Sequence, residues 1–132
     1  MESTGYSEAV TNGIRIIVKS FYISDQSEPT EDHYFFAYRV QIRNEGEQTA
    51  QLMSRYWLIV DGNGQKHEVS GPGVIGEQPL LHPGEHFVYS SFCPLKTPVG
   101  SMEGTYQMIG ENQQVFDAEI GQFTLAMPTS VQ

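Results

Sequence analysis

Cysteine is nearly missing from this chain of 132 residues, because Cys93 is the only one. A single cysteine excludes an internal disulfide framework and a multi-cysteine zinc site. Lysine and arginine are also scarce, numbering 7 against 16 acidic residues, for a formal net charge of -9. A charge of this sign repels nucleic acid and anionic lipid. We expect no nucleic-acid partner and a reducing cytoplasmic setting. The negative charge permits basic protein surfaces or metal ions as partners, but solubility is the favoured interpretation of the acidity.

Long hydrophobic runs are missing as well, since no stretch approaches the roughly 18 apolar residues of a membrane-spanning helix. The first residues, MESTGYSEAV, lack the basic start and apolar segment of a signal peptide. Apolar residues nowhere repeat at helical spacing over a useful length. The length suits one domain without internal repeats, and the 11% of aromatic residues supply its core. We therefore expect one globular domain with no membrane segment.

Alternation of apolar and polar residues predicts β-strands. In the clearest run, apolar residues occupy one face, at Tyr34, Phe36, Tyr38, Val40 and Ile42. Further strands are expected near residues 14–23, 49–60, 66–69, 85–92, 102–109 and 115–125. About seven strands joined by frequent turn signals predict an all-β fold, an immunoglobulin-like or fibronectin type III-like antiparallel β-sandwich.

The ends and two irregular points complete this prediction. Residues 1–12 and 127–132 are polar and lack periodicity, so we expect two tails around a single domain at 13–126. The apolar residues change from even-numbered to odd-numbered positions at Phe21, which predicts a β-bulge in an edge strand. A second change near Gly121 predicts another bulge or bend.

Glycine and proline crowd residues 71–108 and predict a series of tight turns between strands. Within this stretch Gly71, Gly73 and Gly76 spell G-x-G-x-x-G, the pattern that holds pyrophosphate at a helix start in dinucleotide-binding folds. Pro79 follows soon after, so no helix can begin there. A turn-rich connection is the favoured interpretation, and weak docking of a small anion on this candidate binding loop is the alternative.

His82 and His86 are candidate metal ligands because they lie four residues apart with Glu85 between them. On a helix this spacing would aim both imidazoles at one ion, but Pro83-Gly84 turns the chain here and no third ligand is identifiable. Surface histidines are therefore the favoured interpretation, and we expect no cofactor.

No residue pattern predicts catalysis. Cys93 precedes Pro94 without a recognisable base, so we interpret it as a small core hydrophobe rather than a nucleophile. No nucleophile elbow for a serine triad is present. Trp57 is expected in the core, with an exposed recognition patch as the alternative, and Tyr106 is expected to form a tyrosine corner. The chain is thus expected not to be an enzyme.

Several short motifs occur together at characteristic spacings: Tyr38-Arg39-Val40, Ser54-Arg55 with Trp57, GPGVIGEQP, Cys93-Pro94-Leu95, and Met102 with Gly104, Tyr106 and Met108. On these motifs the chain resembles the ApaG family over about residues 10–125. The resemblance implies a bacterial protein with a fibronectin type III-like sandwich. In that family genetics links the bacterial protein to cobalt tolerance and magnesium flux, and the domain in eukaryotic proteins is similar to an interaction module. Tyr56 departs from the usual histidine, and Phe92 from the usual glycine.

We therefore expect a non-enzymatic protein-interaction module of the ApaG type, linked through the resemblance to divalent-cation homeostasis. The alternative is a small-ligand binder that holds a phosphate-type anion at Gly71, Gly73 and Gly76 or a divalent metal ion at His82 and His86. An exposed edge strand would also permit a homodimer.

Overall fold

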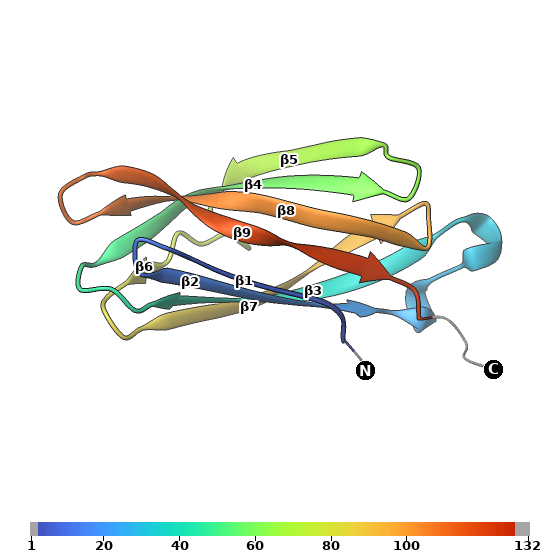
Figure 1. Cartoon of the computed structure of the whole chain (residues 1–132), viewed down its shortest axis with the longest axis horizontal. Coiled ribbons are helices and arrows are strands. Elements are labelled where there is room, and N and C mark those ends of the chain that lie inside the picture. The colour runs from blue at the N-terminus through green and yellow to red at the C-terminus, as the bar shows by residue number, and fades with distance from the viewer. Residues whose placement is uncertain (1–2, 129–132) are drawn as a thin grey trace.

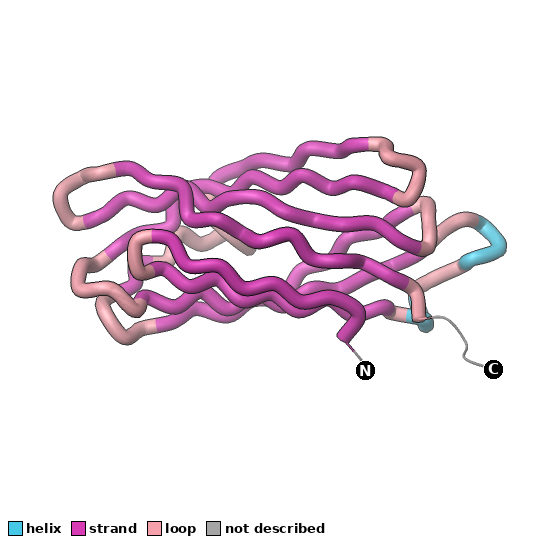
Figure 2. The backbone as a smooth tube through the Cα atoms, in the orientation of Figure 1, coloured by secondary structure: helices cyan, strands magenta, loops and turns pink. Residues whose placement is uncertain are grey.

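The computed structural model describes residues 3–128 and shows two layers of antiparallel β-sheet (Figures 1 and 2). The strands within this range are β1 (Ser3–Thr11), β2 (Ile14–Tyr22), β3 (Tyr34–Asn44), β4 (Ala50–Asp61), β5 (Lys66–Pro72), β6 (Leu80–Leu81), β7 (His86–Leu95), β8 (Val99–Gly110) and β9 (Val115–Ala126). One sheet has the order β1-β2-β3-β7, and the other has the order β5-β4-β8-β9 with β6 beside β4. The predicted all-β sandwich is confirmed, with β1 and the short β6 as strands that the sequence did not indicate.

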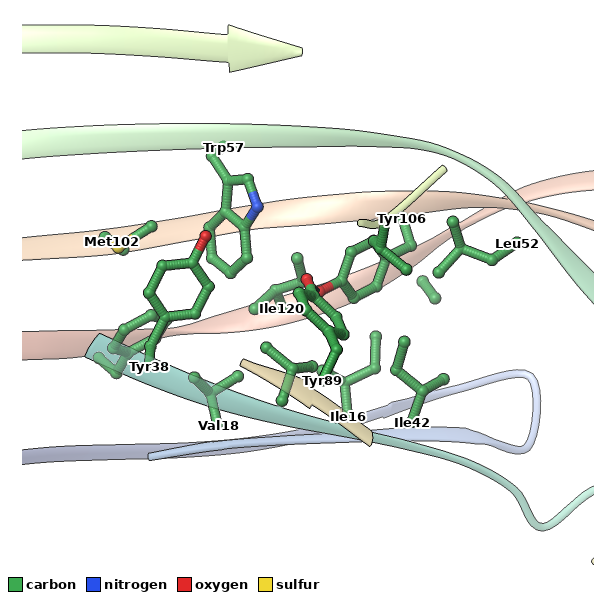
Figure 3. Close-up of a cluster of buried hydrophobic side chains, with 14 of the residues drawn as sticks. Ile16, Val18, Tyr38, Ile42, Leu52, Trp57, Tyr89, Met102, Tyr106 and Ile120 are labelled. Carbon is green, nitrogen blue, oxygen red and sulfur yellow. Dashed lines mark hydrogen bonds between the residues drawn. The ribbon is translucent and has the colours of Figure 1, made fainter. Parts of the chain in front are cut away.

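The core lies between the two sheets, where the predicted alternation holds. Phe36, Val40 and Ile42 of β3 are fully buried. Trp57 of β4 is 2% exposed, and its ring meets that of Tyr38 edge-on with centroids 5.2 Å apart (Figure 3). The interpretation of Trp57 as a core residue is therefore confirmed, and the recognition-patch alternative is wrong.

The N-terminal segment corrects one expectation. Residues 3–11 were expected within a tail, but they form β1, which pairs with β2 along its length. The inward position of β1 is occupied by the buried Ser7, whereas Tyr6 and Val10 are exposed. Because the large apolar residues of β1 point outward, the segment carries no apolar signature of a half-buried strand. Residues 129–132 of the expected C-terminal tail lie outside the described range.

The bulge expected at Phe21 is also placed differently. Strand β2 keeps its register with β3 through Tyr22 and lies inside its sheet, so it is not an edge strand. The extra residue lies in β1, between Ser3 and Gly5, opposite residues 20–21 of β2. The alternation of apolar and polar residues in β2 was misleading because the inward position after Val18 is filled by a polar residue, the buried Ser20. The Ser20 hydroxyl donates to the Thr124 carbonyl at 2.6 Å.

The bulge expected near Gly121 is confirmed, because Met102 pairs with Phe123 and Gly104 pairs with Ile120. One residue of β8 therefore opposes two of β9. A further bulge that the sequence did not indicate lies in β4 between Leu52 and Ser54.

The two sides of the sandwich differ. On one side β1 and β9 lie next to each other (Figure 1). On the other side β5 and β7 are the last strands of their sheets. Within residues 3–128, no helix is long and apolar enough to cross a membrane.

Candidate functional site

Strand β7 has an unpaired edge along the open side of the sandwich. At its start, the Asn44 N–H donates to the Glu85 carbonyl at 2.9 Å, and the register with β3 continues without a shift. In an antiparallel pair, every second residue of a strand bonds through its main chain to the neighbouring strand. Because Glu85 bonds to β3, the odd-numbered residues of β7 that follow it also bond to β3. The even-numbered residues Val88, Ser90 and Phe92 turn their N–H and C=O groups away from β3. We call these three residues the β7 edge; within the described range, β3 is the only strand that pairs with β7.

The side chains of β7 leave this edge unprotected. The strand, HFVYSSFCPL, contains no lysine, arginine, aspartate or glutamate. Phe92 is 59% exposed and stacks on Phe35 with ring centroids 5.4 Å apart. Natural edge strands are usually blunted by charge, proline or coverage. Strand β5 on the same side follows this rule with Lys66 and Glu68, whereas β7 has only Pro94 near its end.

A groove of about 350 Å³ runs beside the β7 edge, between the two sheets. Its apolar walls come from β4, β5 and β7 and include Ile59, Val69 and Leu95, whereas Phe92 borders the groove but turns its ring to the outer face of its sheet, where it stacks on Phe35. Val69 faces Trp57 in the register of β5 with β4, yet it is 43% exposed because no strand of the other sheet covers it. The groove can therefore accept apolar side chains from a segment that lies along β7.

The Gly71–Gly76 candidate loop is a compact hairpin. Val74 and Glu77 exchange two main-chain hydrogen bonds of 2.8 and 2.9 Å around Ile75 and Gly76, both of which have positive φ. The Gly73 N–H donates to the Met53 carbonyl at 2.9 Å. The predicted turn-rich connection is confirmed. Because the amides of residues 73, 74 and 77 already have main-chain partners, they are not turned toward an anion.

A side chain that the sequence interpretation missed fixes this loop. Arg55 of β4 directs its guanidinium at the loop, and Nη1 donates to the carbonyls of Pro72 at 3.0 Å and Gly73 at 2.9 Å. Arg55 lies opposite Gly71 in β5, and a Cβ at Gly71 would lie 3.1 Å from the guanidinium. Gly71 therefore gives room to an arginine rather than to a ligand.

The two candidate metal ligands lie at the turn into β7. His82 and Glu85 form the turn together: the Glu85 carboxylate accepts from the His82 N–H at 2.8 Å and contacts Nδ1 at 2.8 Å. These bonds lower the pKa of Glu85 below its usual value. His86 lies opposite Arg43 of β3. Among residues 3–128, no group of three histidine, cysteine, aspartate or glutamate side chains is placed to hold a metal ion. Metal binding at His82 and His86 stays a prediction.

The buried polar groups are structural. Cys93 is 4% exposed, and burial raises the pKa of its thiol to about 11, so the thiol is neutral near pH 7. Its interpretation as a core hydrophobe is confirmed. Tyr106 does not form the expected tyrosine corner, because its hydroxyl bonds to the Tyr89 hydroxyl across the sandwich rather than to the backbone (Figure 3). Burial raises the pKa of both phenols well above the ordinary value.

Known proteins are similar to this chain in sequence and architecture. Residues 24–110 match the family described as the ApaG domain. Protein ApaG of Anaeromyxobacter dehalogenans (strain 2CP-C) is 53% identical over 125 residues, which cover 95% of this chain and 98% of that protein. A crystal structure of an ApaA protein from Bordetella pertussis has a TM-score of 0.86 at 46% identity, covering 95% of this chain and 97% of the other. The C-terminal domain of Wzt, with a TM-score of 0.53 at 13% identity over 96% of this chain and 80% of that one, shares the fold alone.

Proposed function

The chain belongs to the ApaG family, and from this premise we propose that it is a non-enzymatic, cytoplasmic protein-interaction module whose β7 edge receives an extended strand of a protein partner. The observation that carries the proposal is the uncharged, unpaired edge at Val88, Ser90 and Phe92. A buried thiol in a chain with a single cysteine agrees with a reducing compartment.

Strand addition suits this edge physically. A partner strand would satisfy the free main-chain groups of β7, which supplies affinity, while alternate side chains would enter a pocket, which supplies specificity. The groove beside Phe92 is the pocket, and its apolar walls favour valine-sized or leucine-sized residues. The rigid sheet holds the edge ready, so little ordering of this chain opposes binding.

The proposal also gives a role to the link with divalent cations that the family resemblance implies. In this role, the chain would act on cobalt tolerance or magnesium flux through its protein partner rather than by holding the ion itself. A second copy of this chain could occupy the same edge, because two uncharged β7 strands would not repel one another.

Site-specific photo-crosslinking tests the proposal. A crosslinking amino acid replaces Ser90 on the β7 edge or, as a matched control, Ser70, which has the corresponding free position on the charged edge of β5. In a lysate of cells that naturally make the protein, we expect one defined adduct from position 90 and none from position 70. Light scattering of the purified protein distinguishes a second copy from a different partner.

Ser90→Pro provides the complementary test, because it removes one free N–H without touching the bonds between β7 and β3. We expect it to abolish capture of the crosslinked partner, whereas Ser70→Pro leaves capture intact. Equal capture by both variants would contradict binding at the β7 edge.

A small-ligand function is the second candidate, supported by the exposed contact between His82 and Glu85. These two side chains supply part of a ligand set for a divalent ion, and His86 lies close in sequence. Calorimetry with cobalt, magnesium and pyrophosphate tests it, with His82→Ala/His86→Ala as the variant. Dissociation constants weaker than about 1 mM, or no change in the variant, would contradict this function.

A further inference from the structure

Four of the seven lysine and arginine residues gather on one surface, although the chain has a net charge of -9. The inward positions of β2 and β3 are the even-numbered residues, so the odd-numbered ones form the outer face of the four-stranded sheet. We call the four cations there the cationic face: Arg15, Lys19, Arg39 and Arg43.

The register sets these cations directly against each other. Lys19 lies opposite Arg39, and Arg15 lies opposite Arg43. Like charges in directly opposed positions of an antiparallel pair destabilise a sheet. Folding alone therefore gives no reason for this arrangement.

In the part of the chain that the structure describes, only one of the two pairs has carboxylate partners. Arg15 bonds to Glu8 and, at 2.9 Å, to Glu45, and Arg43 lies 3.9 Å from the same Glu45. Within residues 3–128, no acidic oxygen lies within 4.0 Å of Lys19 or Arg39. Both side chains are exposed, so their charges face solvent without a counter-charge from any described residue.

The sheet surface is hollowed at this unneutralised pair. The hollow measures about 220 Å³ and is lined by Tyr6, Ile17, Lys19, Arg39 and Gln41. Ligand pockets for whole small molecules are usually about 300–1,000 Å³. The hollow is therefore suited to a single side chain with an anionic end: Ile17 offers apolar contact to its stem, and Lys19 and Arg39 flank its charge.

We propose that this hollow binds a glutamate or aspartate side chain of an acidic segment in a protein partner; this inference rests on the proposed function and names the chemistry of the partner. The same outer face carries the exposed Tyr6 and Val10, at 53% and 51%. Apolar residues beside cations suit a protein segment. A long polyanion would be repelled by Glu8 and Glu45, which border the face, and by the net charge of the body.

The hollow is also within reach of a strand added at the β7 edge. Ser90 is the neighbour of Arg39 in the register of β3 with β7. A residue opposite Ser90 on an added strand would lie two strand spacings, about 10 Å, from Arg39. Arginine and glutamate side chains together span that separation, and the small Ser90 does not block it. The acidic residue of the partner is therefore expected to face outward, on the opposite side of its strand from the residues that enter the groove.

The test uses a defined probe. A fluorescein-labelled pentapeptide of alternating valine and glutamate, with valine at both ends, has two carboxylate side chains, and its glutamine counterpart with the same label has none. Fluorescence anisotropy compares the wild type with Lys19→Glu/Arg39→Glu and with Lys66→Glu/Asn112→Glu/Gln114→Glu, which makes the same change of net charge at exposed positions off this face and outside the groove. We expect the first variant to weaken binding of the glutamate peptide about tenfold or more relative to the second, and high salt to remove that difference.

Amide chemical shifts locate the site, and we expect changes at Lys19, Arg39 and Gln41. Equal affinities of the two variants, or equal binding of the glutamine peptide, would overturn the inference. If inorganic phosphate binds more strongly than the glutamate peptide and shifts the same amides, the hollow is a site for a free oxyanion rather than for an acidic segment. That outcome would also overturn the inference. The crosslink at position 90 is read separately, so its persistence in Lys19→Glu/Arg39→Glu would show that only the acidic contact, not the strand addition, has failed.

Discussion

Removing one hydroxyl of the Tyr89–Tyr106 pair should cost more than removing both. The two hydroxyls bond only to each other among the side-chain contacts of the described residues, and Tyr106 is fully buried while Tyr89 is 6% exposed. Tyr106→Phe leaves the Tyr89 hydroxyl without a partner in an apolar environment. The cost of an unsatisfied buried polar group is about 1–3 kcal/mol. Because one kcal/mol shifts the midpoint of a domain of this size by about 4 °C, we expect Tm to fall by about 4–12 °C.

The double variant Tyr89→Phe/Tyr106→Phe replaces both partners by apolar groups of nearly the same shape. Such a replacement is close to neutral, so we expect the free energy of unfolding to stay within about 1 kcal/mol of the wild type. If Tyr89→Phe costs a similar amount, the two single changes sum to about 2–6 kcal/mol, so they fail to add by at least about 1 kcal/mol.

Urea unfolding followed by tryptophan fluorescence measures this cycle. Trp57 is the only tryptophan, and its ring centroid lies 6.3 Å from that of Tyr106, so its emission reports loss of this part of the core. Tyr6→Phe serves as a control because the Tyr6 side chain is exposed. A double variant that is destabilised by the sum of the two single changes would refute the buried hydroxyl pair.

Three further outcomes are expected. Gly104→Ala should lower the free energy of unfolding by about 1–3 kcal/mol in urea titrations, because its Cβ would lie 1.9 Å from the Tyr56 carbonyl oxygen, whereas Gly110→Ala, with no atom nearer than 3.8 Å, should have little effect. Lys19→Gln should raise thermal stability slightly, by about 0.2–1 kcal/mol, because it removes the repulsion of Arg39; an unchanged or lower Tm would contradict this. The free energy of unfolding should fall above about pH 9. The pKa of Cys93 is raised to about 11 and the pKa values of the two buried tyrosines are also raised, so the unfolded chain loses these protons at lower pH than the folded chain does. A flat profile of stability from about pH 8 to 11 would contradict this.

Alternation predicted the strands that have one apolar and one polar face. Strand β3 buries every even-numbered residue from Tyr34 to Asn44, so its pattern was readable without any tertiary information. Strand β1 was not readable, because its inward Ser7 is polar and its outward Tyr6 and Val10 are apolar. The polar Ser20 misplaced the bulge for the same reason. Pattern reasoning fails where the polarity of a side chain disagrees with its burial.

The candidate site was less predictable than the fold because it depends on which strands are neighbours. Residues 86–95 could be assigned to a strand from the sequence, but that strand becomes an edge only because it pairs with β3, some 50 residues earlier. The free positions at Val88, Ser90 and Phe92 follow from that pairing. The Gly71–Gly76 pattern, by contrast, was conspicuous in the sequence, and its glycines serve a tight hairpin and the room that Arg55 needs.

The outward positions of the cations were visible in the sequence, whereas the pairing of like charges across β2 and β3 was not. Alternation placed Arg39 and Arg43 on the polar side of their strand, where isolated charges are ordinary. Only the register of β2 with β3 brings Lys19 against Arg39. A like-charged pair without a counter-ion lowers the stability of the free protein, and an acidic segment that neutralises it would recover that energy on binding. The same two side chains therefore connect stability to recognition: a change that removes their repulsion should stabilise the free protein and weaken its complex, two opposite effects that a purely structural role of Lys19 and Arg39 would not produce.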